Sequence, residues 1–124
     1  MEKGKTLVDC RNQMLNRFHE AGEQCDKLRR MLIANLQLVR DCERKLKIGK
    51  NTYKYLWQFR TVINPDEVRD CTLSCVKDSV QFYSDRLAML TKNRKLLIFR
   101  FKNAQRRESK AFRRLRKFDV KNFR

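Results

Sequence analysis

Glycine and proline, the residues that most often interrupt helices, are scarce in this chain: its 124 residues include three glycines and one proline. This scarcity excludes a fold with many tight turns and favours long, uninterrupted helices. Long apolar runs are missing as well, because the longest, such as 31–34 and 96–99, cover about one helical turn and not a bilayer span. The length leaves room for a single domain.

Catalytic and secretory features are also missing from the sequence. The single histidine, His19, has no credible nucleophile beside it, and no Gly-rich phosphate-binding loop is present. We therefore predict no catalytic residue, no cofactor and no enzymatic activity. The first residues lack the apolar core of a signal peptide, so we expect an intracellular protein, cytoplasmic or nuclear.

Five cysteines are scattered along the chain without a CxxC pair. In a reducing compartment such cysteines are free thiols that pack as small hydrophobic side chains. Zinc binding by Cys42, Cys71 and Cys75 is the alternative, but a zinc site would need a fourth ligand. The sequence therefore predicts no metal site, and the state of these three thiols stays open.

Acidic residues are nearly absent from the C-terminal quarter of the chain. Residues 91–124 hold 14 of the 31 basic residues, opposed by Glu108 and Asp119 alone, which gives this segment a net charge of +12 out of +17. A segment of this kind repels itself unless it stays solvated or meets a polyanion. The charge therefore predicts an acidic partner.

The first long helix is indicated by apolar residues that recur in alternating steps of three and four, a coiled-coil pattern. The stripe consists of Leu7, Cys10, Met14, Phe18, Ala21, Cys25, Leu28, Leu32, Asn35, Val39, Cys42 and Leu46. Basic residues near position 45, followed by Gly49 as a C-terminal cap, predict that this helix spans about 6–48.

A short connecting helix is predicted over about 52–62, where apolar and aromatic residues follow Asn51. Asn64 and Pro65 then suit the N-cap and first position of a second long helix over about 65–118. The apolar stripe of this helix consists of Leu73, Val76, Val80, Tyr83, Leu87, Leu90, Arg94, Leu97, Phe101, Ala104, Glu108, Ala111, Leu115 and Phe118.

Two long helices with a short connection pair in antiparallel fashion, because neither buries its apolar stripe alone. The predicted fold is all-α: an elongated antiparallel helical hairpin, coiled-coil-like, with a short connecting helix and a basic C-terminal helical arm. If residue 48 lies beside residue 65, the numbers of paired residues sum to about 113. Residues after about 107 then project beyond the first helix, and Arg94 lies level with residue 19, near Glu20.

The basic arm is the strongest candidate site, because dense cations suit phosphate or carboxylate groups. The predicted polyanion-binding residues are Arg100, Lys102, Arg106, Arg107, Lys110, Arg113, Arg114, Arg116, Lys117, Lys121 and Arg124. Ser109 follows two arginines and an acid, so it is a possible phosphorylation site whose modification would reduce the charge of the arm.

The first helix has an apolar face wider than the stripe alone, to which Met31 and Leu38 contribute, and we expect these two residues to pack against partner helices. The sequence thus predicts a non-enzymatic structural or assembly protein that docks on partner helices and holds an acidic protein surface with its basic arm. It would be part of a larger complex or a homo-oligomer. A sequence-nonspecific nucleic-acid-binding protein is the alternative, and a membrane is the least favoured partner because the apolar face of the arm is thin.

Overall fold

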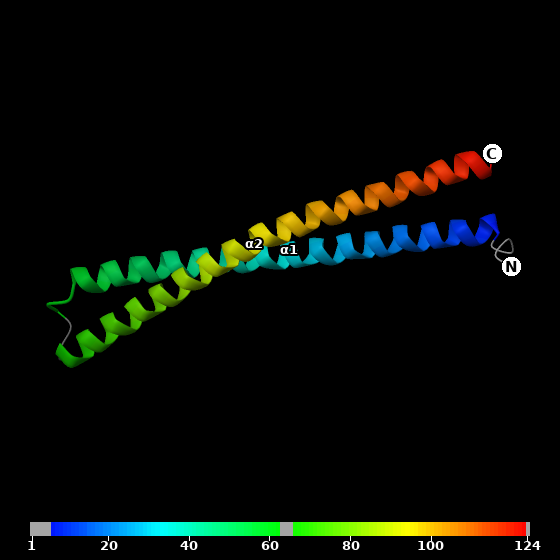
Figure 1. The fold of residues 1–124 in the computed structure, drawn as a ribbon. Coiled ribbons are helices and arrows are strands. Elements are labelled where there is room, and N and C mark those ends of the chain that lie inside the picture. The colour runs from blue at the N-terminus through cyan, green and yellow to red at the C-terminus, as the bar shows by residue number, and fades with distance from the viewer. Residues whose placement is uncertain (1–5, 63–65, 124) are drawn as a thin grey trace. The chain divides into compact units, whose positions relative to one another are not determined.

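The computed structural model describes residues 6–62 and 66–123, which form two long helices, α1 (Leu7–Gln58) and α2 (Asp66–Asn122) (Figure 1). No strand occurs within these described ranges. The two helices pack against each other as an antiparallel hairpin, as the sequence predicts. Neither helix contains, in its described residues, a stretch that is both long and apolar enough to cross a membrane.

The predicted end of the first helix at residue 48 is wrong, because α1 continues through Gly49 to Gln58. Residues 52–58 are therefore part of α1, and a separate connecting helix is not formed. Gly49 is half-buried, and a Cβ atom at this position would lie 3.0 Å from Cγ2 of Val80. This glycine thus allows a side chain of α2 to approach closely, and packing against α2 overrides its intrinsic cost of about 1 kcal/mol in a helix.

Local hydrogen bonds mark both ends of α1. At its N-terminus the backbone N–H of Asp9 donates to Oγ1 of Thr6 at 3.1 Å, and the N–H of Thr6 donates to Oδ2 of Asp9 at 3.3 Å, a reciprocal capping arrangement. Just beyond its C-terminus, Arg60 donates from Nη1 to the carbonyl of Trp57 at 2.8 Å. Its guanidinium also lies 4.3 Å from the centre of the Trp57 ring system. Arg60 therefore satisfies a terminal carbonyl that the helix itself leaves unpaired.

The second helix begins close to its predicted start and ends later than predicted. Its first turn contains Asp66 and Glu67, which interact favourably with the helix dipole. The predicted capping residues Asn64 and Pro65 lie outside the described residues. The helix continues beyond residue 118 to Asn122.

The chain divides into two compact units that each contain a piece of both helices. Unit 1 comprises residues 1–33 and 95–124, and unit 2 comprises residues 34–94. The prediction of a single domain stays a prediction.

In unit 1 the N-terminal part of α1, blue in Figure 1, lies beside the C-terminal part of α2, orange to red. One buried cluster consists of Cys25, Leu28, Leu97 and Ala104, so both helices contribute to the core, and Leu115 is buried farther along α2. Leu32 and Phe101 pack against this core, and the guanidinium of Arg29 lies 5.6 Å from the centre of the Phe101 ring.

The register of unit 1 differs from the predicted one. Nε of Arg11 lies 2.9 Å from Oδ1 of Asp119, and the rings of Phe18 and Phe112 have centroids 5.6 Å apart. Both pairs have residue numbers that sum to 130, not to about 113. Because α1 ends ten residues later than predicted, it faces residues of α2 that were expected to project beyond it. The part of α2 after residue 107 therefore packs beside α1, and the predicted projecting arm is wrong for these residues.

Among the described residues of unit 2, the buried ones all belong to α1: Asn35, Val39 and Cys42. Nδ2 of Asn35 donates to the backbone carbonyl of Leu90 at 3.1 Å, whereas its Oδ1 atom is buried without a hydrogen-bond partner. The three buried residues of α2 all lie in unit 1. The described part of α2 in unit 2 thus packs on α1 through half-buried residues only.

The predicted apolar stripes are confirmed almost completely. Every predicted stripe residue of both helices is buried or half-buried, apart from Leu7 at the start of α1. The repeat of three and four also continues past Leu46 through Gly49, Tyr53 and Leu56, which are half-buried. Coiled-coil packing in the strict sense stays a prediction.

Candidate polyanion-binding surface

Unit 1 holds most of the net charge of the protein. It contains 19 basic and 7 acidic residues, a net charge of +12, whereas unit 2 contains 12 basic and 7 acidic residues, a net charge of +5. The predicted polyanion-binding residues from Arg100 to Lys121 are all exposed, as long cationic side chains prefer to be. Arg124 lies outside the described residues.

The heptad positions of these cations decide which of them lie together. If each repeat is lettered a to g with the stripe at a and d, position g lies next to d on one flank of the helix, and c lies beyond g. Arg100, Arg107 and Arg114 all occupy position g of α2. Successive members of this row are separated by about 10.5 Å along the helix axis, because an α-helix rises 1.5 Å per residue.

A groove between α1 and α2 follows this flank of unit 1. One section of about 500 Å³ has basic walls formed by Arg17 of α1 and by Arg107, Lys110 and Arg114 of α2. The adjoining section adds Lys27 of α1 and Arg100 of α2 and shares Arg107 with the first. Glu20 is the one acidic residue among the described residues that line the two sections.

The floor of the groove is apolar. It contains the small side chains of Ala21, Ala104 and Ala111, together with Met14 and Met31 at its two ends. Ala104 is buried, and Ala21 and Ala111 are half-buried. Because alanine fills little space between two helices, the groove is hollow where these residues face each other.

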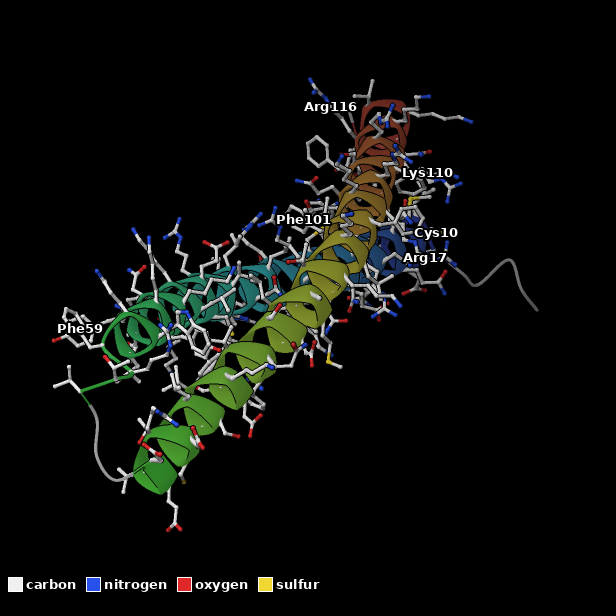
Figure 2. The ribbon with its side chains drawn as sticks, turned by 90° about the vertical axis from the view of Figure 1, so that its left-hand side faces the viewer. Cys10, Arg17, Phe59, Phe101, Lys110 and Arg116 are labelled. Atoms are coloured by element: carbon white, nitrogen blue, oxygen red, sulfur yellow. The ribbon has the colours of Figure 1, made fainter. Side chains whose placement is uncertain are left out.

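The other predicted cations lie outside the groove. Lys102, Arg106 and Arg113 surround Ser109 on the outer surface of α2, and Arg113 donates from Nε to the Ser109 carbonyl at 3.4 Å. Arg116, Lys117 and Lys121 gather near the end of α2. Figure 2 shows Arg17 and Lys110 on one side of the paired helices and Arg116 on the other. The predicted set is thus divided between two surfaces.

The two acidic residues of the basic segment are turned toward α1. Asp119 makes two hydrogen bonds with Arg11, from Nε at 2.9 Å and from Nη2 at 3.4 Å. Glu108 is half-buried beside Gly22, where a Cβ atom would lie 3.0 Å from the Glu108 Oε2 atom. Neither carboxylate lines the groove, where Glu20 is the acidic residue among the described lining residues.

The predicted contact of Arg94 with the region of Glu20 depends on the register that the structure overturns. In unit 1, Glu20 shares the groove with Lys110, in agreement with paired residue numbers that sum to about 130. Seam residues of α2 near position 108, and not near position 94, therefore face this part of α1.

The thiols do not belong to a grouped metal site among the described residues. No three His, Cys, Asp or Glu side chains of the described ranges are grouped as metal ligands. Cys42 is buried, whereas Cys71 and Cys75 are exposed one helical turn apart. Burial raises the pKa of the Cys25 thiol, and the nearby Glu108 carboxylate raises this pKa further. Cys25 is therefore held as a neutral thiol in the core of unit 1.

Met31 and Leu38, predicted to pack on partner helices, are each 42% exposed. Both occupy position g of α1, with Met31 at one end of the groove in unit 1 and Leu38 in unit 2. Ser109 is exposed. These placements leave all three residues accessible to a partner or a modifying enzyme.

Sequence reasoning missed two members of the groove, Arg17 and Lys27. The mild overall charge of residues 1–48 concealed them, and the predicted register placed them opposite residues well before Arg107. Arg17 occupies position g of α1, so its heptad position, combined with the correct register, would have placed it beside the row on α2.

These features define a helical hairpin in which one unit carries a cationic groove with an apolar floor. No protein-family model, curated protein or solved structure matches the chain.

Proposed function

We propose that the protein is a non-enzymatic structural or assembly protein that joins partner helices to an acidic protein surface, for example in a cytoskeletal lattice or another large assembly. The observation that carries the proposal is the charge of unit 1, whose net charge is +12. Apart from Arg11, the cations among its described residues are exposed, while Asp119 and Glu108 face α1. An uncompensated cationic surface attracts and orients an acidic partner.

Unit 2 supports the docking part of the proposal through its exposed apolar side chains. Leu38, Ile48 and Tyr55 of α1 and Phe82 and Met89 of α2 are all more than 40% exposed. All five occupy position g or c, on one flank of their helices. Exposed apolar surface of this kind is typical of protein–protein contacts.

Nucleic-acid binding is the second candidate, because exposed phenylalanine accompanies the cations on the outer surface of α2. Phe99 is 64% exposed and precedes Arg100 in the sequence. A base could stack on such a ring while nearby arginines neutralise phosphates. This mode uses the outer cations, such as Arg106, and not the groove.

Isolation of the protein from its native source, with and without nuclease treatment, tests the proposal. We expect an acidic protein to remain bound after nuclease treatment and to dissociate as salt is raised, since salt screens exposed charges. Loss of all bound material on nuclease treatment would contradict the proposal and favour the nucleic-acid alternative. In that case affinity for duplex DNA should fall about 10³-fold or more between 50 and 200 mM salt if six or more phosphates are contacted.

A further inference from the structure

The cationic groove of unit 1 combines two chemistries that point to one kind of occupant. Its walls carry Arg17, Arg107, Lys110 and Arg114, which suit carboxylates or phosphates. Its floor consists of apolar side chains such as Ala104 and Met14, which gain nothing from a solvated phosphate chain. An occupant that satisfies both needs an apolar ridge bordered by acidic groups.

Nucleic acid meets these requirements poorly. Aromatic side chains, on which single-stranded bases stack, are not among the described residues that line the groove. Phe112 instead packs on Phe18, and Phe99 is absent from both sections of the lining. A phosphate backbone in the groove would engage the walls and leave the apolar floor without a partner.

We propose that the groove binds an acidic amphipathic α-helix of a partner protein, laid along α1 and α2 of unit 1 as a third helix. This inference rests on the proposed function and specifies which element of the acidic partner is recognised. Alanines at positions 21, 104 and 111 permit the close approach that helix packing requires, with axes about 8–10 Å apart. Leucine-sized side chains of the partner would fill the space above these alanines.

The spacing of the cations sets the sequence pattern of the bound helix. Arg100, Arg107 and Arg114 repeat every seven residues along α2, while Arg17 and Lys27 lie on the α1 side of the groove. A bound helix with apolar residues at i, i+3 or i+4, and i+7, bordered on both sides by glutamate or aspartate, would place carboxylates next to both walls. Engagement of the arginine row from Arg100 to Arg114 spans about 21 Å, or about four turns of the partner helix.

The test compares two arginine pairs in the full-length chain. Arg107→Gln with Arg114→Gln removes two charges from the groove, and Arg106→Gln with Arg113→Gln removes two charges from the outer surface of α2. The two double variants have equal net charge and substitute neighbouring residues of the same helix. The probe is a stapled acidic helical peptide with a leucine row bordered by glutamates, and the control peptide has the same composition with its charges distributed around the helix.

We expect the groove pair to weaken binding of the patterned peptide by about tenfold or more, since charge-assisted hydrogen bonds are lost, and the outer pair to weaken it by less than about threefold. The patterned peptide should also bind more tightly than the control peptide. Ala111→Leu, which fills the groove without changing the charge, should weaken the patterned peptide while leaving binding of polyglutamate unchanged. Circular dichroism verifies that each variant stays helical.

The possible results separate this inference from the proposed function. Equal losses for the two arginine pairs, or equal binding of the two peptides, would overturn the groove as a helix site while leaving an acidic partner in place. Duplex DNA that binds more tightly than the patterned peptide, and loses affinity in the groove pair, would assign the groove to nucleic acid and overturn the inference. Failure of every acidic polypeptide to bind would overturn both proposals.

Discussion

Unit 1 and unit 2 are built from the same two helices but differ in what they bury and what they expose. Unit 1 buries residues from both helices, among them Leu28 and Leu97, and exposes most of its described cations together with apolar side chains such as Phe99. Unit 2 buries Asn35, Val39 and Cys42 of α1 alone, with one polar atom unpaired, and exposes apolar side chains on both helices. The difference indicates that the core of unit 1 is the better packed, and it is consistent with the proposal that a partner covers the apolar side chains of unit 2.

The contrast is sharpest at heptad positions g and c. In unit 1 these positions of α2 include Arg107, Lys110 and Arg114, whereas in unit 2 they include Phe82 and Met89. The a and d residues form the contact between α1 and α2 in both units, and in unit 1 the alanines among them also form the floor of the groove. Two helices with the same heptad repeat can therefore expose different side chains in each unit, because the residues beside the stripe are less constrained by packing between α1 and α2.

An acidic substitution in the apolar stripe should give the largest difference in stability between the two units. Leu97 is buried in unit 1, whereas Leu87 is half-buried in unit 2. We expect Leu97→Asp to lower the free energy of unfolding by about 3–5 kcal/mol, because it buries an unpaired carboxylate, and Leu87→Asp to cost less, because water can reach the new charge. Thermal and urea denaturation followed by circular dichroism measures both. A larger loss of unfolding free energy for Leu87→Asp would contradict the conclusion that unit 1 has the better packed core.

Substitution of Asn35 should have the next largest effect on the free energy of unfolding, and it should stabilise the protein. Its buried Oδ1 atom lacks a hydrogen-bond partner, while its Nδ2 donates to a carbonyl of Leu90. Asn35→Leu should raise the free energy of unfolding by about 1–2 kcal/mol, since it replaces a buried amide by an apolar group. The urea midpoint measures the change. Destabilisation by more than about 1 kcal/mol would show that the amide is better satisfied than its contacts indicate.

The two helical glycines offer a matched pair, one in each unit. A Cβ atom at Gly22 would meet the mobile end of the Glu108 side chain, whereas one at Gly49 would meet a methyl group of the β-branched Val80, each at 3.0 Å. Gly22→Ala should therefore retain most of the helix-propensity gain of about 1 kcal/mol, and Gly49→Ala should lose part or all of it to repacking. Equal shifts in melting temperature would show that Val80 yields as readily as Glu108.

The ion pair between Arg11 and Asp119 should contribute least. The two side chains are 39% and 34% exposed, so solvent screens their attraction. Asp119→Asn should lower the free energy of unfolding by less than about 1 kcal/mol, and the difference should shrink at high salt. Melting temperatures in low and high salt measure it. A loss that is larger and independent of salt would give the pair a role in packing rather than in charge.

The two stripes were predictable from the sequence because burial along a helix repeats every three or four residues. The end of α1 was not predictable, because a glycine such as Gly49 fits two structures. It can cap a helix that ends there, or it can allow close approach of a neighbouring helix if the helix continues. The half-buried Tyr53 and Leu56 keep the stripe spacing beyond Gly49, and this spacing was the feature of the sequence that indicated a longer helix. One wrong helix end then displaced every predicted pairing.

The composition of the candidate site was easier to predict than its geometry. Lysine and arginine outside the stripe are mostly exposed on such helices, so the cationic surface could be predicted from the charge count. Which cations share a groove depends on the register and on small residues such as Ala111 at positions that face the other helix. The contribution of Arg17 from α1 therefore required the structure.

The most direct test of the account is the register of unit 1, since the groove exists only if the basic segment lies beside the start of α1. In a variant without native cysteines, a short bis-maleimide linker can be offered to cysteines placed at positions 17 and 114, and separately at positions 17 and 96. We expect rapid intramolecular cross-linking between Arg17→Cys and Arg114→Cys. Cross-linking between Arg17→Cys and Leu96→Cys should be slight. Preferential cross-linking of positions 17 and 96 would restore the projecting arm and contradict the groove.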